Sequence, residues 1–155
     1  MFGGVGGDRV RLALEHRLCG VCGRSLDEGR LVLLMRLSDV SHERSYEPGL
    51  HPVCAKYTID ACPMVAGRVE RYRSAPMRLD DTMIDDLDVA ERRGALAAPW
   101  FAVWVREYRV IIDHGKPAAS YAGTKPLRVQ PIGRTAAALL ALRELLLGGV
   151  DETGG

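Results

Sequence analysis

Two short stretches, Cys19-Gly20-Val21-Cys22 and His51-Pro52-Val53-Cys54, decide how this chain can fold. In each of them, two side chains that bind soft or borderline metals stand three residues apart. A C-x-x-C turn brings two thiolates to one point, and structural zinc sites combine two such pairs of Cys and His in a tetrahedron. The sequence therefore predicts that Zn²⁺ is bound by Cys19, Cys22, His51 and Cys54 and closes the loop between the two stretches.

The second stretch coincides with the start of a predicted helix. Pro52 favours the first turn, where a proline loses no hydrogen bond, and the helix should continue from Val53 to Ala61. His51 and Cys54 then share one face of its first turn. A knuckle, a β-arm and ligands at a helix N-terminus form the layout of a treble-clef zinc finger, which residues 17–63 resemble.

The same motif also resembles small uncharacterised proteins of actinobacteria and their phages or plasmids. The resemblance consists of the C-x-x-C knuckle, the later H-P-x-C-A-x-Y and a following C-P. It implies the zinc fold and no particular mechanism.

A further cysteine, Cys62, leaves the choice of the fourth ligand open. Cys62 follows the predicted helix and precedes a proline, so the alternative quartet is Cys19, Cys22, Cys54 and Cys62, with His51 as a neighbour. A cysteine in this position can also be a buried apolar residue. The remaining histidines have no partner at ligand spacing, and we expect surface or capping roles for His16, His42 and His114.

The composition is that of an ordinary globular protein. The chain has 155 residues, of which 47% are hydrophobic, and its formal net charge of +1 gives no whole-molecule field that would direct it to nucleic acid or an anionic membrane. The N-terminus lacks the apolar core of a secretory signal, and the longest apolar helical run is too short to span a bilayer. We expect a cytoplasmic protein with no membrane partner, whose cysteines are metal ligands rather than disulfides.

The first half of the chain is predicted to be the zinc-binding treble-clef-like domain, over residues 8–78. Asp8 is expected to cap a short helix ahead of the first cysteine pair. Arg30 to Leu37 is short and apolar and is bounded by turn residues, which favours a strand. Met64 to Arg73 predicts another strand or an extended arm, with Val65 and Val69 facing inward.

The second half predicts an acidic segment and then a β-rich part, which makes the fold α+β. Residues 79–98 hold six acidic residues against two arginines and indicate an acidic amphipathic helix or linker. Residues 99–148 predict a small antiparallel β-meander with a C-terminal helix at 136–147. The meander begins with an aromatic strand from Trp100 to Asp113 and continues with one or two strands within 118–132. We expect this part to pack on the first half, because each half is small for an independent core.

Four residues after the expected metal site suggest a nucleic-acid-binding arm, namely Arg68, Arg71, Tyr72 and Arg73. In an extended arm Arg71 and Arg73 face one side, which suits DNA or RNA phosphates, with an aromatic ring nearby. The alternative is a solvated strand whose arginines reflect a GC-rich genome, since 18 of the 21 basic residues are Arg.

Three classes of function follow. The preferred one is a non-enzymatic zinc-binding accessory or regulatory protein associated with nucleic acid or with a nucleic-acid-bound partner. The second is a protein–protein interaction adaptor or homodimer module, with the acidic segment or the apolar strand 100–112 as its surface. The third is a zinc-dependent hydrolase or nuclease, which needs an open coordination position and a general base. The chain has no H-E-x-x-H or deaminase pattern and no Asn for a His-Asn-His site, so we lean against an enzyme and assign no catalytic residue.

Overall fold

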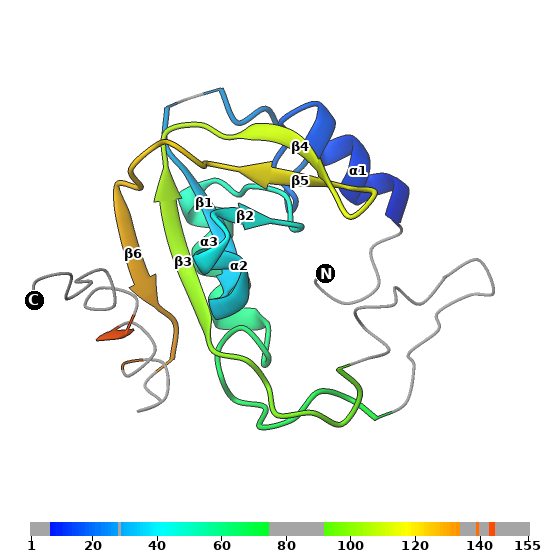
Figure 1. The fold of residues 1–155 in the computed structure, drawn as a ribbon, viewed down its shortest axis with the longest axis vertical. Coiled ribbons are helices and arrows are strands. Elements are labelled where there is room, and N and C mark those ends of the chain that lie inside the picture. Colours follow the sequence, from blue (N-terminus) through cyan, green and yellow to red (C-terminus); the bar gives the residue numbers. More distant parts are fainter. Residues whose placement is uncertain (1–6, 28, 75–91, 134–138, 140–142, 145–155) are drawn as a thin grey trace, which may run out of the picture.

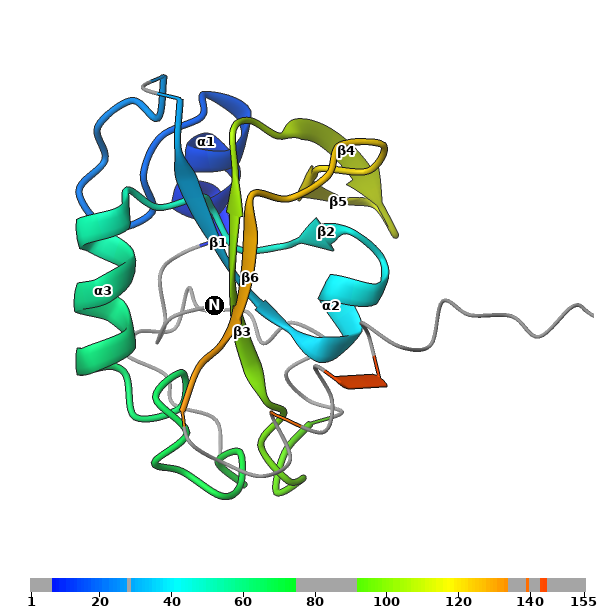
Figure 2. The same ribbon diagram turned by 90° about the vertical axis from the view of Figure 1, so that its left-hand side faces the viewer.

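The computed structural model of the chain describes residues 7–27, 29–74, 92–133, 139 and 143–144. These residues form a mixed α+β fold (Figures 1 and 2). The helices are α1 (Gly7–Glu15), α2 (Leu37–Ser41) and α3 (Pro52–Ala61). The strands are β1 (Leu31–Arg36), β2 (Arg44–Ser45), β3 (Trp100–Val105), β4 (Arg109–Asp113), β5 (Lys116–Ser120) and β6 (Arg128–Pro131). None of the helices in the described part is long and apolar enough to cross a membrane.

The strands form two three-stranded antiparallel sheets, in the orders β1-β3-β6 and β2-β5-β4. In the first sheet, β1 pairs with β3 from Leu31↔Val105 to Arg36↔Trp100. In the second sheet, β2 pairs with β5 through Arg44↔Ser120 and Ser45↔Ala119. Each sheet therefore combines a strand from residues 31–45 with two strands from residues 100–131, and neither part of the chain completes a sheet without the other.

The apolar strand predicted at Arg30 to Leu37 is confirmed as β1, and it lies in the centre of the core. Its residues Leu31 to Met35 are all buried, on both faces of the strand. Figure 2 shows why: α3 lies on one side of the β1-β3-β6 sheet, and α2 and the second sheet lie on the other. A strand that is covered on both faces needs a continuous apolar run rather than an alternating one.

The aromatic stretch from Trp100 to Asp113 is two strands rather than the single one predicted. It is interrupted between β3 and β4, and the two strands belong to different sheets. Tyr108 lies in the interruption, is buried, and donates its hydroxyl to the main-chain oxygen of Leu14 at 3.4 Å. The expected meander also differs in order, because β6 pairs with β3 and not with its neighbour in sequence, β5.

Residues 64–73 do not form the predicted strand. The chain turns at residues 63–67 after α3, where the N–H of Arg68 donates to the oxygen of Pro63 at 2.8 Å. Val65 is buried, as expected, but only an isolated bridge between Arg71 and Leu96 is sheet-like. Most of the predicted acidic helix and of the predicted helix at 136–147 falls outside the described residues. α1 begins at Gly7, which places Asp8 inside the first turn.

Candidate metal centre

Four side chains from the two ligand motifs meet at one point. The sulfur atoms of Cys19, Cys22 and Cys54 and a ring nitrogen of His51 all lie within 4.8 Å of one another. Cys22 Sγ is 3.4 Å from His51 Nδ1. Cys62 is not in this group: it is the C-cap residue of α3 and packs against the core.

A tight hairpin presents the first pair of sulfur atoms. Leu18 and Ser25 form an antiparallel bridge, and inside it the N–H of Cys19 donates to the oxygen of Arg24 at 2.8 Å. The N–H of Gly23 donates to the oxygen of Cys19 at 2.9 Å, and Gly23 has φ +70°, a conformation that glycine adopts at no steric cost. This knuckle buries Cys19, which is 1% exposed, and leaves Cys22 at the surface.

The core strand β1 positions the second pair. Leu50 is fully buried and exchanges two hydrogen bonds of 2.9 Å with Val32 of β1, N–H to oxygen in both directions. Next to it, the oxygen of Gly49 accepts from the N–H of Gly20 in the knuckle at 3.1 Å. His51 follows directly as the N-cap of α3, and Pro52 opens the helix as predicted. The central strand therefore determines where the imidazole lies.

The orientation of the imidazole is set by a contact that the sequence motif does not contain. His51 Nε2 lies 2.9 Å from the main-chain oxygen of Ser25. A carbonyl oxygen can only accept, so Nε2 carries the hydrogen and Nδ1 of the neutral ring offers its lone pair toward Cys22. Histidines that bind metals typically donate their second N–H in this way. No side-chain pattern encodes a main-chain carbonyl, so this partner could not be found from the sequence.

The three thiols differ in their tendency to ionise. Burial opposes ionisation of Cys19, but hydrogen bonds from the main chain of Cys22, His51 and Val21 outweigh it and lower the pKa of this thiol. Burial, together with the neighbouring sulfur atoms of Cys19 and Cys22, raises the pKa of Cys54 to about 12. Three thiolates this close together repel one another, which disfavours ionisation, whereas a dication bound between them would favour the deprotonated form of all three thiols.

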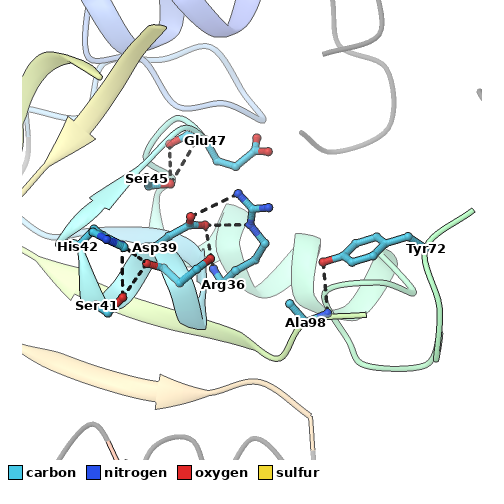
Figure 3. Close-up of polar contacts among 9 residues, drawn as sticks. Arg36, Asp39, Ser41, His42, Ser45, Glu47, Tyr72 and Ala98 are labelled. Carbon is cyan, nitrogen blue, oxygen red and sulfur yellow. Dashed lines mark hydrogen bonds and ion pairs between the residues drawn. The ribbon is translucent and has the colours of Figure 1, made fainter. Parts of the chain in front are cut away.

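Of the residues expected to bind nucleic acid, the three arginines are exposed and Tyr72 is half-buried, and their contacts run to α3 and to residues 92–98. Arg68 donates to the main-chain oxygen of Asp60, and Arg71 donates to that of Gly94, both at 3.0 Å. Tyr72 is fixed at both ends: its hydroxyl accepts from the N–H of Ala98 at 3.2 Å (Figure 3), and the guanidinium of Arg92 lies 5.4 Å from its ring centre. We call residues 68–73 and 92–98 together the arginine arm.

The remaining predicted residues have ordinary structural positions. His42 is the C-cap residue of α2, and its Nδ1 lies 2.6 Å from the oxygen of Ser38 (Figure 3). This agrees with the capping role expected for it, while His16 and His114 are exposed. Beside His42, Arg36 binds Asp39 through Nε and Nη2, at 2.9 and 3.3 Å.

The arrangement can hold one metal ion through three sulfur atoms and one nitrogen. This donor set suits a borderline or soft ion in tetrahedral geometry and does not suit magnesium or calcium, which prefer oxygen. Comparison with protein-family models, with curated proteins and with solved structures finds no match for this chain.

Proposed function

We propose that the chain is a non-enzymatic protein whose N-terminal half is stapled by a structural Zn²⁺ bound to Cys19, Cys22, His51 and Cys54. The observation that carries this proposal is the separation of the four donor atoms, at most 4.8 Å. Zinc–sulfur bonds of about 2.3 Å in a tetrahedron keep sulfur ligands roughly 3.8 Å apart. The site therefore needs to close by at most about 1 Å to hold the ion.

The route of the chain through the site supports a treble-clef type of unit. The knuckle lies at residues 18–25, and the main chain of Leu50 returns along β1 to deliver His51 and Cys54 at the start of α3. The four ligands come from two places far apart in the sequence, so the ion closes a long loop. Structural zinc in small folds contributes on the order of 10–16 kcal/mol of folding free energy.

The donor set supports a structural role rather than a catalytic one. Catalytic zinc sites keep one position for water or substrate, whereas four protein ligands complete a tetrahedron. All four donors here come from residues that the main chain holds in place through the knuckle, Leu50 and the helix start.

Exposed arginines in the segment after α3 support association with nucleic acid as the role of the stapled protein. Within the arginine arm, Arg68 and Arg71 are exposed and donate to neutral main-chain oxygens, contacts that leave their positive charge in place. Such a surface attracts phosphates without reading bases. Tyr72 then supports the arm, because its ring and hydroxyl are already engaged.

Metal content and chelation test the first part of this proposal. Elemental analysis of the purified protein is expected to give one zinc per chain, and cobalt substitution should give the thiolate-to-metal and tetrahedral ligand-field bands of a sulfur-rich site. A strong chelator should destabilise the whole fold, because both sheets combine strands of the two halves, and circular dichroism follows the unfolding. A metal-free protein whose thermal stability is unaffected by the chelator contradicts the proposal.

Salt-dependent binding tests the second part. Fluorescence anisotropy with labelled duplex and single-stranded DNA should show affinity that falls as salt rises, with a log–log slope of about −0.9 per phosphate contact for the duplex and about −0.7 for the single strand. Arg68→Glu with Arg71→Glu should weaken binding at least about tenfold, and Arg106→Glu with Lys125→Glu is the control of equal charge change. Equal loss in both double variants, or no binding at low salt, rejects the nucleic-acid role and leaves the zinc site untouched.

A further inference from the structure

The outer strand of the second sheet has one edge without a partner among the described residues. β4 is bonded to β5 only, as the last strand in the order β2-β5-β4. Two apolar side chains of this short strand are exposed, Val110 at 38% and Ile112 at 72%. In Figure 2, β4 lies at the upper right, on the opposite side of the molecule from α3, the helix that contains Cys54. Exposed edges of this kind are sites at which another chain can add a strand.

The turn after β4 determines which main-chain groups lie on the open edge. His114 and Gly115 have φ angles of 48° and 76°, which is the two-residue type I′ turn of a hairpin. The residues that flank such a turn, Asp113 and Lys116, exchange main-chain hydrogen bonds. Bonded and non-bonded positions then alternate along the strand.

Counting back from Asp113 in steps of two, the main-chain N–H and C=O groups of Ile111 and Arg109 also point toward β5. The N–H and C=O groups of Val110 and Ile112 therefore face away from β5, on the open edge. The open edge offers two donors and two acceptors, on the same two residues whose side chains are exposed.

We propose that β4 pairs in antiparallel fashion with β4 of a second copy of this chain, about a two-fold axis at Ile111. In this register Val110 lies opposite Ile112 of the second copy, and the reverse pair is identical by symmetry. All outward donors and acceptors of both strands are then used, in four hydrogen bonds. The apolar side chains of the two pairs form one stripe across the interface.

The charges of β4 complement each other in this register. Arg109 lies opposite Asp113 of the second copy, at both ends of the interface. Within its own chain, Oδ2 of Asp113 binds Arg44 Nε at 2.6 Å, and Nη2 of Arg109 donates to the main-chain oxygen of Ala122 at 3.0 Å. The contact across the axis is therefore made by the other carboxylate oxygen and the other guanidinium nitrogens. With the axis at Val110, Arg109 would lie opposite Ile111 of the second copy. With the axis at Ile112, Asp113 would lie opposite Ile111. Only the axis at Ile111 pairs opposite charges.

The predicted interface is small. A pairing of two five-residue strands buries much less than the roughly 1,600 Å² of a standard stable interface. We therefore expect a dimer that dissociates on dilution. The metal centre does not contribute to this surface, so dimerisation and metal binding can each be tested with the other intact.

Sedimentation velocity across a concentration series, from about 1 µM to about 1 mM, tests the dimer. The wild-type protein should change from monomer to dimer over this range. Ile112→Lys should shift the midpoint to at least about tenfold higher concentration, through a buried charge on the apolar stripe. Tyr57→Lys is the matched control, because Tyr57 is 66% exposed on α3 and lies away from β4. A wild-type protein that is monomeric throughout, or a control that weakens the dimer equally, overturns the proposal.

Disulfide trapping tests the register. Residues at the two-fold axis form a non-hydrogen-bonded pair with Cα atoms about 4.5 Å apart, within the range of a disulfide. Ile111→Cys should therefore give a covalent dimer under mild oxidation. Ile112→Cys should not give a covalent dimer, because residue 112 lies opposite Val110 of the second copy, two residues along the strand from residue 112 of that copy. The wild-type protein controls for the native cysteines. Equal trapping at both positions, or none at Ile111→Cys, rejects this register.

Discussion

The Nε2–H of His51 donates to the main-chain oxygen of Ser25 across 2.9 Å, and this bond directs Nδ1 at the sulfur of Cys22. Ser25 ends the hairpin that carries Cys19 and Cys22, and His51 is the N-cap residue of α3. The two halves of the candidate site are thus joined by protein alone. The site does not rely on the metal to choose which nitrogen of the ring becomes the ligand.

The tautomer of His51 is the first prediction. In the zinc-loaded protein, His51 should keep its hydrogen on Nε2 and bind the ion through Nδ1, because the carbonyl of Ser25 cannot donate. Long-range proton–nitrogen NMR correlations distinguish the two nitrogens. His114, exposed in the β4–β5 turn, is an internal reference that has no such constraint. A hydrogen found on Nδ1 of His51 contradicts the assignment.

Variants of His51 and Cys62 discriminate between the two ligand sets, and a variant of Cys54, which belongs to both sets, is the positive control for loss of metal. Cys54→Ser should reduce zinc affinity by more than about 100-fold, since even the loss of an outer-shell partner costs 10–100-fold. Cys62→Ser should keep one zinc per chain, because Cys62 lies at the far end of α3. Competition with a chromophoric chelator measures both affinities. If Cys62→Ser loses the metal and His51→Ala retains it, the alternative quartet with Cys62 is the correct one.

A small residue is required where the knuckle meets the core. A Cβ at Gly49 lies 3.0 Å from Leu26 Cδ1, 3.1 Å from Leu31 Cδ1 and 3.2 Å from Tyr108 Cε1. Gly49→Ala should therefore reduce the free energy of unfolding by roughly 1–3 kcal/mol through overpacking. Urea denaturation checks this, with Gly7→Ala as the control, because a Cβ at Gly7 has no neighbour within 4 Å. Equal stability of the two variants contradicts the predicted clash.

Acid should weaken the connection between β2 and β4. The hydroxyl of Tyr46 donates to Asp113 and Arg44 lies beside it, and together they lower the pKa of this carboxyl against the opposing effect of burial. A lowered folded pKa means that the stabilisation is complete above the ordinary Asp pKa of about 3.9 and is lost as pH falls through the folded value. The free energy of unfolding should thus decrease below about pH 4.

Asp113→Asn should remove this component of the acid response. Denaturation at several pH values, at protein concentrations too low for dimerisation, compares it with the wild type. Asp60→Asn is the control, because the Lys56–Asp60 pair is largely exposed and contributes little. An unchanged acid response in Asp113→Asn rejects the role of this carboxylate.

Local features of the sequence predicted the parts of the fold that local rules determine. Pro52 after a ligand predicted the start of α3, and the continuous apolar run predicted β1. The spacing of Cys19 with Cys22, and of His51 with Cys54, predicted which four donors meet. Ligand pairs and helix starts are specified within a few residues, so periodicity and capping rules suffice for them.

Non-local pairing was outside the reach of these rules. The stretch from Trp100 to Asp113 is rich in strand-forming residues on both sides of Arg106-Glu107, and in the interruption Tyr108 is buried and donates to Leu14 of α1. The partner of β6 is β3, which follows from how the two sheets share the core and not from any turn signal. The support of Tyr72 by Arg92 likewise joins segments that are separated by a long stretch of chain.

The pairing of Met35 with Phe101, and of Leu31 with Val105, has a consequence for how the protein is made. During synthesis on the ribosome, the apolar strand β1 emerges long before β3, the strand that pairs with its edge, has been translated. The knuckle and α3 each depend on residues close in sequence and can form during this interval, whereas the β1-β3-β6 sheet can form only after β3 has been translated. Until translation passes Val105, the nascent chain carries an open apolar edge that invites aggregation. Slow elongation between these strands should therefore reduce the yield of soluble protein more than it affects the stability of the finished molecule.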